Sequence, residues 1–521
     1  MASPPVVHAS QGNGADKSAP ADVCLIVEGG YPYVTGGVAS WTDALMRASP
    51  QITFHIVAIA ISKQPRRRIF VLPDNAVGVT DVIIDVCPRG RIPTGKDVDR
   101  VKRVLRLLEE SLTTGDETTF MELIEQVRIT GFGQAALLDS KEGWDAMEKA
   151  YRRLLPNGPL LDFFWSWRFL VRSVLAVINT PLPQARVFHA VATGFSGLVG
   201  SYAKLVANLP LLVTEHGIYT NERRIELAVA DWLFDSGAGG YVTAEPIELR
   251  SIWSNAFQCF SRFSYAVADV ITTQYRANQI FQRTDGAPEH KLRIIPNGID
   301  VARFTAIPRD TAPRPPTVLM VGRIVPIKDV RTFIMAVARL KDLVPNVVAI
   351  LIGPEDEDPE YAASCHQLVD QLGIQSSIQF LGRVPDVMKY LRSTDVLALS
   401  SISESQPLAM LEAAATGLAI VSTEVGSCRE IIEGFEGDPV RGRGGFVVEP
   451  CNPKAMAEAL ATILLDGPMR SEMAEVMRRR VASYYHKDRV TRIYEELYAE
   501  MMAQPAPLID LEHHDRNKCH H

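Results

Sequence analysis

The chain has 521 residues, too many for one hydrophobic core, and this length predicts two or three domains. Its hydrophobic content of 47% and charged content of 22% are typical of a soluble globular protein. A formal net charge of −7 gives no basis for nucleic-acid binding, which usually needs a strongly basic domain. The seven cysteines include no C-x-x-C pair, a usage that indicates reduced thiols in the cytoplasm.

The chain ends and the longest apolar stretch predict no signal peptide and no transmembrane segment. Residues 1–20 are rich in Ala, Ser, Pro and Gly, so we expect a disordered leader. The longest apolar stretch, Val187–Val213, contains His, Lys and Pro, which favours a buried strand and helix over a membrane span. Residues 504–521 cluster His and Cys. Metal binding is one interpretation of that cluster, but we expect a flexible tail.

The first half of the chain predicts a parallel sheet with alternating helices. We expect a buried strand at the continuous apolar run 23–27, and further strands at 54–59, 187–191, 211–213, 270–273 and 292–295. From about residue 88 to 181 the chain reads mainly as helices, an insert that is large for a connection between a strand and a helix.

A glycine pair, Gly36 and Gly37, opens the helix after the first strand. Backbone N–H groups at such a pair can approach a phosphate or a sugar closely. The segment lacks the G-x-G-x-x-G pattern, which counts against a dinucleotide such as NAD. The alternative interpretation is a plain tight turn, and a lone glycine pair favours it.

His216 directly follows a predicted buried strand and has Glu215 and Gly217 as its neighbours. A histidine there can hydrogen-bond a sugar hydroxyl or help to neutralise charge. A structural role is the alternative, and the ionisable residues of the same segment make the two interpretations equally good.

A Pro-rich segment, residues 301–316, predicts a linker to a second α/β domain. We expect strands there at 318–321, 347–352, 378–381, 396–399, 418–422 and 444–448, followed by helices at 453–465 and 469–502. Arg323 and Lys328 follow the first of these strands, where a guanidinium fork and an ammonium can clamp a diphosphate. A surface loop with two basic residues is the alternative.

Two carboxylates, Glu404 and Glu412, bracket the start of a helix in the second half. Pro407 marks the helix start, and free N–H groups in the first turn favour a phosphate. A carboxylate in the helix can accept ribose hydroxyls, and the loop carboxylate can accept hydroxyls of a sugar. Ordinary surface acids at a helix start are the alternative, which the spacing alone favours. The backbone of residues 382–384 can read the edge of a nucleotide base.

Taken together, these segments resemble a known family. The second half resembles the retaining glycosyltransferases of family 4, which have the GT-B fold, through GRIVPIKD, FLGRV and ESQPLAMLEAAATG. The first half narrows the resemblance to the PelF-type glycosyltransferases of Pel exopolysaccharide synthesis, through LIVEGGYPYVTGGVASW, FHAVATGFSGLVG and TEHGIYTNERRIEL. The resemblance covers roughly residues 23 to 502. Gly30 departs from the family's EGTYPY form.

The resemblance implies an α/β protein with two Rossmann-like domains facing across a cleft and a helical insert in the first. The implied organisation is an acceptor-side domain at 21–300 with its insert at 88–181, a linker at 301–316, a nucleotide-sugar domain at 317–475 and a helix at 476–503 that crosses back. It also implies a nucleotide-diphosphate sugar donor, with UDP-glucose expected, and no required metal or other cofactor.

The family's site residues carry over by position. The implied catalytic residues are His216, Arg323, Lys328 and Glu404. Arg323 and Lys328 are expected to bind the pyrophosphate and stabilise it as it leaves, while Glu404 faces the donor sugar. The implied donor-binding residues are Gly36, Gly37, Arg323, Lys328, Arg383, Val384, Glu404, Leu408, Ala409 and Glu412. Glu412 is expected to hold the ribose, and Arg383 and Val384 to lie near the uracil.

The expected activity is transfer of a sugar to a growing polysaccharide acceptor, in the cytoplasm and in association with inner-membrane synthesis proteins. Two alternatives remain open. One is a scaffold that binds the nucleotide sugar without catalysis and docks on a membrane synthase complex. The other is a nucleotide-sugar epimerase of the same fold.

Overall fold

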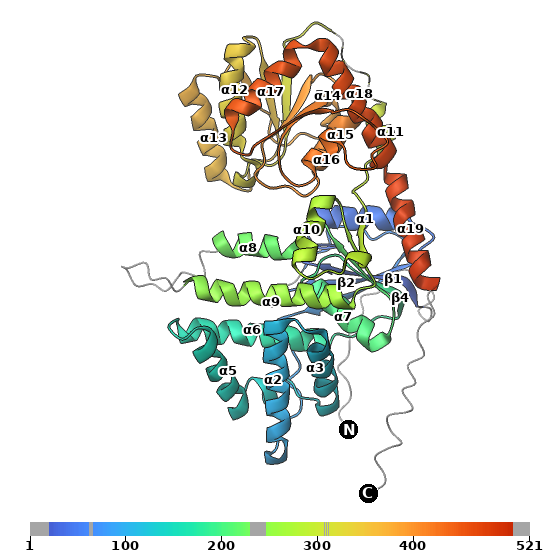
Figure 1. The fold of residues 1–521 in the computed structure, drawn as a ribbon, viewed down its shortest axis with the longest axis vertical. Helices are drawn as coiled ribbons and strands as arrows, with labels where there is room; N and C mark the ends of the chain where they lie inside the picture. Colours follow the sequence, from blue (N-terminus) through green and yellow to red (C-terminus); the bar gives the residue numbers. More distant parts are fainter. Residues whose placement is uncertain are drawn as a thin grey trace. The chain divides into compact units, whose positions relative to one another are not determined.

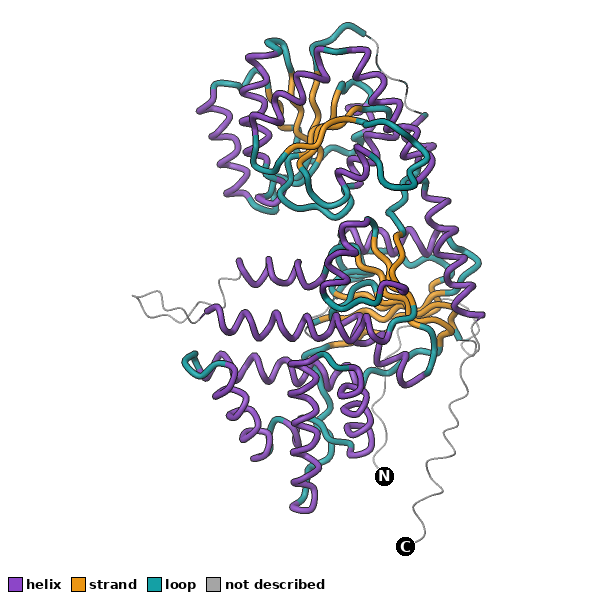
Figure 2. The backbone as a smooth tube through the Cα atoms, viewed as in Figure 1, coloured by secondary structure: helices purple, strands orange, loops and turns teal. Residues whose placement is uncertain are grey.

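The computed structural model describes residues 20–61, 66–229, 246–306, 308, 310 and 312–503, with only the backbone at 225–229 and 246–248. Most of the expected leader, the whole tail and parts of the expected linker lie outside these residues. Contacts divide the chain into two compact units (Figures 1 and 2). Among the described residues, unit 1 contains those up to Thr273, Gln279–Arg293 and those from Tyr494 onward, and unit 2 contains Gln274–Asn278 and Ile294–Ile493.

Unit 1 is built on a seven-stranded sheet. Its strands are β1 (Ala21–Glu28), β2 (Phe54–Ala60), β3 (Ala76–Ile83), β4 (Ala185–Ala190), β5 (Leu211–Glu215), β6 (Val270–Thr273) and β7 (Leu292–Ile294). They lie in the order β3-β2-β1-β4-β5-β6-β7, and the pairs from β3 to β6 are parallel. The sequence missed β3 because this edge strand is mostly half-buried and has no continuous apolar run.

The helices of unit 1 cover both faces of its sheet, and five of them form the insert between β3 and β4. The insert contains α2 (Val98–Thr114), α3 (Glu117–Thr130), α4 (Gln134–Leu137), α5 (Lys141–Leu154) and α6 (Leu160–Ile178). The other helices are α1 (Gly37–Ala48), α7 (Phe195–Ala207), α8 (Tyr219–Val229), α9 (Pro246–Val267) and α10 (Arg276–Thr284), whose first residues belong to unit 2. In the insert, α2 and α3 pack on α9 and α6 packs on α7, which confirms the predicted helical insert (Figure 1).

Unit 2 repeats the architecture with a six-stranded sheet. Its strands are β8 (Thr317–Val321), β9 (Val348–Ile352), β10 (Ile378–Phe380), β11 (Val396–Leu399), β12 (Ala419–Thr423) and β13 (Gly445–Val448). Their order is β10-β9-β8-β11-β12-β13, and every adjacent pair is parallel. Counted within each unit, both sheets share the strand order 3-2-1-4-5-6 of a Rossmann fold, so the prediction of two Rossmann-like domains is confirmed.

The helices of unit 2 enclose its sheet on both faces (Figure 2). They are α11 (Val301–Thr305), α12 (Val330–Leu343), α13 (Pro359–Leu372), α14 (Met388–Leu391), α15 (Leu408–Ala415), α16 (Cys428–Glu433), α17 (Pro453–Leu465), α18 (Gly467–Tyr484) and α19 (Lys487–Ala503), whose last residues belong to unit 1. The segment expected to be a linker begins with α11, whose Val301 and Phe304 are buried in the core of unit 2.

The single helix predicted over 469–502 is wrong, because the chain breaks between α18 and α19. At the break, the backbone of Ile299 is hydrogen-bonded to the residues where α18 ends and α19 begins. The Ile299 N–H donates to the Tyr485 carbonyl at 2.9 Å, and the Ile299 carbonyl accepts from the Lys487 N–H at 2.9 Å. A residue that pairs like a strand cannot continue a helical ladder, and this tertiary contact ends α18.

The carboxyl ends of the strands gather at one edge of each parallel sheet. In both units the strand order reverses between two central strands, β1 and β4 in unit 1 and β8 and β11 in unit 2. Open parallel sheets bind ligands at such switch points. Within the described ranges, no helix has the length and apolar character needed to cross a bilayer, and no group of three His, Cys, Asp or Glu residues is arranged to hold a metal.

Candidate functional site

The switch point of unit 2 brings together two residues that the sequence singled out separately. Lys328 lies in the loop after β8, and Glu404 lies in the loop after β11. The Lys328 ammonium donates to Glu404 Oε1. The two side chains are only 20% and 11% exposed, so this ion pair is partly withdrawn from water and less screened than a surface pair.

Backbone and hydroxyl contacts fix the Glu404 loop. The Ser400 hydroxyl donates to the Lys328 carbonyl at 2.9 Å, and the Ile402 N–H donates to the Ile327 carbonyl at 2.9 Å. The Ser401 hydroxyl donates to Glu404 Oε1 at 2.7 Å, so it shares the carboxylate with Lys328. The carboxylate is therefore held at the strand ends and does not move freely in solvent.

The helix α15 starts beside this pair. Pro407 is its N-cap, and no side chain caps the first-turn N–H groups of Leu408 and Ala409. Uncapped N–H groups and the positive end of the helix dipole favour an anion at this position. Glu412 lies one turn further on. Burial raises the pKa of its carboxyl, and the charge of Arg303 opposes that shift.

The two arginines predicted to bind the donor lie at the ends of other strands in unit 2. Arg323 follows β8, is about half exposed and pairs with Glu357. Arg383 follows β10, is 74% exposed and lies 3.8 Å from Asp356. Val384 packs partly buried against the core of unit 2. Unlike Lys328 and Glu404, these arginines contact residues that the sequence did not single out.

The remaining predicted site residues belong to unit 1. Gly36 and Gly37 begin α1, which has no side-chain cap. A Cβ built on either glycine meets no atom within 4 Å, and neither has a left-handed backbone. Packing within unit 1 therefore does not explain why glycine stands at these two positions.

His216 follows β5 and has an aromatic environment. The Trp41 ring meets the imidazole edge to face, with centroids 4.5 Å apart. The residue keeps some exposed surface, but burial of its imidazole lowers the pKa of His216 to about 4. It is therefore neutral at pH 7 and can exchange a hydrogen bond with a sugar hydroxyl.

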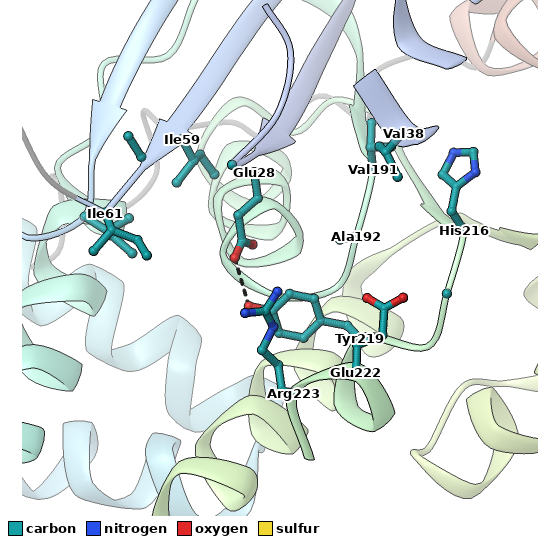
Figure 3. Close-up of a pocket in the computed structure, with 14 residues that line it drawn as sticks. Glu28, Val38, Ile59, Ile61, Val191, Ala192, His216, Tyr219, Glu222 and Arg223 are labelled. Atoms are coloured by element: carbon teal, nitrogen blue, oxygen red, sulfur yellow. Dashed lines mark hydrogen bonds between the residues drawn. The ribbon is translucent and has the colours of Figure 1, made fainter. Parts of the chain in front are cut away.

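A cavity of about 290 Å³ lies at the switch point of unit 1. Its apolar wall includes Val38, Ile59 and Val191. Its polar lining residues are Glu28, His216, Tyr219, Glu222 and Arg223 (Figure 3). This size is at the lower end of the range for small-molecule sites and suits a ligand about as large as one sugar.

Glu28 is the polar centre of this cavity and is not among the site residues predicted from the sequence. Tyr219 OH donates to Glu28 Oε1 at 2.9 Å (Figure 3), and the Phe195 N–H donates to Glu28 Oε2 at 2.9 Å. Phe195 opens α7, so a carboxylate of the protein occupies the helix N-terminus after β4. The signal available in the sequence was its position directly after the predicted strand 23–27; in the structure it is the last residue of β1. Burial raises the pKa of Glu28, and the charge of Arg223 opposes the shift.

A buried hydrogen-bond chain links β4, β5 and α19. His189 Nδ1 bonds Tyr498 OH at 2.7 Å, and its Nε2 bonds the Thr214 hydroxyl at 2.8 Å. His189 is 0% exposed, and burial lowers its pKa to about 3. The chain anchors the residues of α19 that belong to unit 1 against the strand that precedes His216.

We expect acid to destabilise unit 1 through His189. Between pH 7 and pH 5 the unfolded chain binds a proton at this imidazole and the folded unit does not, so the free energy of unfolding falls by about 2 kcal/mol. Urea unfolding at both pH values, followed by tryptophan fluorescence, measures the change. Other groups of unit 1 contribute as well: burial lowers the pKa of His216, which adds a fall of the same sign, and raises the pKa of Glu28 and Glu215, which opposes it. The contribution of His189 is therefore measured as the difference in pH dependence between wild type and His189→Gln. An equal pH dependence in both proteins would contradict the expectation.

Comparison with known proteins defines the class. Over 92% of this chain and 100% of the other, the fold is similar to that of Anabaena Alr3699/HepE solved with UDP-glucose, with a TM-score of 0.54 and 14% identity. It is also similar to sucrose-phosphate synthase from Thermosynechococcus elongatus, with a TM-score of 0.56, 17% identity and coverage of 93% and 99%. The fold is therefore that of the GT-B glycosyltransferases, and residues 305–480 match the model of Glycosyl transferases group 1. The chain belongs to the family described as Domain of unknown function (DUF3492), whose model matches residues 21–290.

Curated relatives match part of the chain. A D-inositol 3-phosphate glycosyltransferase of Corynebacterium urealyticum is 29% identical over 255 residues, or 46% of this chain. The lipopolysaccharide core biosynthesis glycosyltransferase LpsE of Rhizobium meliloti is 29% identical over 214 residues, or 40% of this chain. The matched region spans 58% of the length of each of these relatives.

Proposed function

We propose that this protein is a retaining glycosyltransferase of family 4 that moves a sugar from a nucleotide-diphosphate donor, UDP-glucose, to a growing polysaccharide. The observation that carries the proposal is the Lys328–Glu404 pair at the switch point of unit 2, beside the uncapped start of α15. A cation, a carboxylate and a helix N-terminus are the groups needed to hold a diphosphate and its sugar.

The chemistry follows from where charge develops. As the sugar leaves, negative charge grows on the diphosphate and positive charge grows on the sugar ring. Fixed cations and dipoles at the diphosphate then stabilise the transition state more than the ground state. In this proposal Lys328 and Arg323 bind the diphosphate with the N–H groups of Leu408 and Ala409, and their charge takes the place of a metal ion.

The other residues have recognition roles in this proposal. Glu404 exchanges its bond with Lys328 for hydroxyls of the donor sugar, and Glu412 accepts hydroxyls of the ribose. Arg383 and Val384 lie near the uracil. Unit 2 is thus the donor-side domain in this proposal. Gly36 and Gly37 keep the phosphate-binding role that the resemblance implies.

Unit 1 is the acceptor-side domain in this proposal. Its cavity is lined by carboxylates, a neutral histidine and apolar side chains, as suits a sugar with hydroxyl edges and an apolar face. His216 then exchanges a hydrogen bond at the reacting sugar. The curated relatives are named as glycosyltransferases and two solved neighbours are complexes with UDP-glucose or with UDP and glucose, which supports the donor class.

We further propose the biological setting that the motifs of the first half imply. The acceptor is an exopolysaccharide of the Pel type, made for the biofilm matrix. The protein acts in the cytoplasm and meets the inner membrane through polysaccharide synthesis proteins.

A thermal-shift screen of nucleotide sugars tests the proposal first. A ligand that binds only the folded state raises the melting temperature by mass action, and we expect UDP and UDP-glucose to give the largest rise. The screen includes GDP-, ADP- and dTDP-sugars as matched controls, followed by a UDP-release assay with a cell-derived polysaccharide fraction. No shift with any nucleotide sugar would refute the donor site. Binding without turnover would favour the scaffold.

A further inference from the structure

One loop of unit 2, residues 353–358 after β9, lies between two loops that carry arginines of the proposed donor site. In the sheet, β9 is the strand between β8 and β10. The Gly322 N–H donates to the Ile352 carbonyl at 2.9 Å, and the Gly353 N–H donates to the Gly382 carbonyl at 3.0 Å. A Cβ on Gly353 would lie 1.8 Å from the Gly322 carbonyl oxygen, so only glycine permits this close approach.

Consecutive acids of this loop face the arginines on both sides. Glu357 pairs with Arg323, which follows β8. Asp356 lies 3.8 Å from Arg383, which follows β10. Neither acid is among the site residues predicted from the sequence.

Contacts with α13 fix both ends of this acidic segment. Glu355 is hydrogen-bonded to His366 at 2.9 Å, and Asp358 accepts from the Tyr361 N–H at 3.0 Å as the N-cap of the helix. These contacts hold the loop that carries Asp356 and Glu357. Each of these two acids lies within reach of one arginine.

We propose that Glu357, and more weakly Asp356, hold the donor-site arginines when no donor is bound and so determine the affinity for the diphosphate. The inference rests on the proposed function. Arg323 gives an Nη1 N–H to Glu357. A phosphate that takes the planar fork of Arg323 competes for that N–H group, so donor binding displaces the carboxylate. Glu357 is thus a determinant of donor affinity that touches the arginine and not the donor.

The strength of the two arginine–carboxylate pairs decides how much they lower the affinity for the donor. Both partners of the Arg323–Glu357 pair are about half exposed, and such pairs are weak and screened by salt. A diphosphate carries more charge and accepts bidentate bonds, so it displaces the glutamate. The Arg383–Asp356 pair is longer and more exposed, so it opposes the donor less.

The test is titration of the full chain with UDP at low ionic strength, by calorimetry. We expect Glu357→Gln to lower the Kd for UDP about two- to fivefold, and the gain to disappear at high salt. Asp356→Asn is expected to give a smaller gain. The matched control is Glu360→Gln, which removes an exposed carboxylate from the first turn of α13 without touching either arginine.

The outcomes separate the inference from the function on which it rests. If wild type binds UDP and Glu357→Gln binds it no more tightly than Glu360→Gln, Glu357 does not compete with the donor. Weaker binding by Glu357→Gln would also overturn the inference, because the glutamate would then be orienting Arg323 for the donor. If wild type binds neither UDP nor another nucleoside diphosphate, the proposed donor site itself is wrong, and this inference falls with it.

Discussion

Lys328→Ala is expected to abolish sugar transfer. Lys328 supplies the ammonium at the switch point of unit 2, where the proposed leaving diphosphate gains charge. Removing one preorganised group of this kind typically lowers kcat by about 10²–10³-fold. UDP release from UDP-glucose measures the loss, and calorimetry with UDP separates weaker donor binding from slower chemistry.

The same variant leaves Glu404 without its cation, so its fold needs checking. A circular dichroism spectrum and a melting temperature close to those of wild type show that unit 2 survives. Lys328→Ala combined with Glu404→Gln removes the uncompensated charge and is expected to remain inactive. Lys389→Ala, an exposed lysine on α14, is the matched control and keeps activity. Undiminished turnover in the Lys328 variant would refute the proposed site.

Arg480→Met is expected to destabilise unit 2 by about 3–5 kcal/mol, the usual cost of breaking a buried ion pair from one side. Arg480 is 0% exposed, and its guanidinium donates to Asp438 Oδ2 at 2.5 Å. It also donates to the carbonyls of Ile431, Ile432, Val440 and Gly442. The substitution leaves these acceptors and a buried carboxylate without their donor.

The measurement has to report on unit 2. All six tryptophans precede residue 254 and so lie outside unit 2, and fluorescence does not follow its unfolding. Urea unfolding by circular dichroism and amide hydrogen exchange of residues 434–445 do follow it. Arg478→Met on the same helix is the control. Its pair with Glu475 is exposed and contributes at most about 1 kcal/mol. Equal stability of both variants would contradict the expectation.

The sequence was most informative where burial dictates composition. The apolar runs of β1 and β11 predict strands because a strand covered on both faces needs apolar side chains throughout. The edge strand β3 was not predicted, since it is mostly half-buried and Gly78, Thr80 and Asp81 interrupt its apolar residues. The break between α18 and α19 was not predicted either, because the backbone pairing with Ile299 that ends α18 is a tertiary contact.

In the candidate site, too, the sequence predicted some residues and only the tertiary structure revealed others. Arg323, Lys328, His216 and Glu404 were predicted because each follows a predicted strand and has a side chain able to bind a nucleotide sugar. It did not select Glu28, Tyr219 or Glu357, whose significance lies in what they contact. Glu28 and Tyr219 are 191 residues apart in the chain and form one hydrogen bond in the cavity of unit 1.

The sequence by itself determined two Rossmann-like domains, a helical insert and charged residues at the ends of particular strands, because strand burial and turn chemistry are local properties. Only the tertiary structure decided which charges meet: Lys328 with Glu404 across 76 residues, and Arg323 with Glu357. The physical reason is that strand order sets these neighbours. Placing β11 next to β8, and β9 between β8 and β10, depends on packing of the whole sheet, which no single segment encodes.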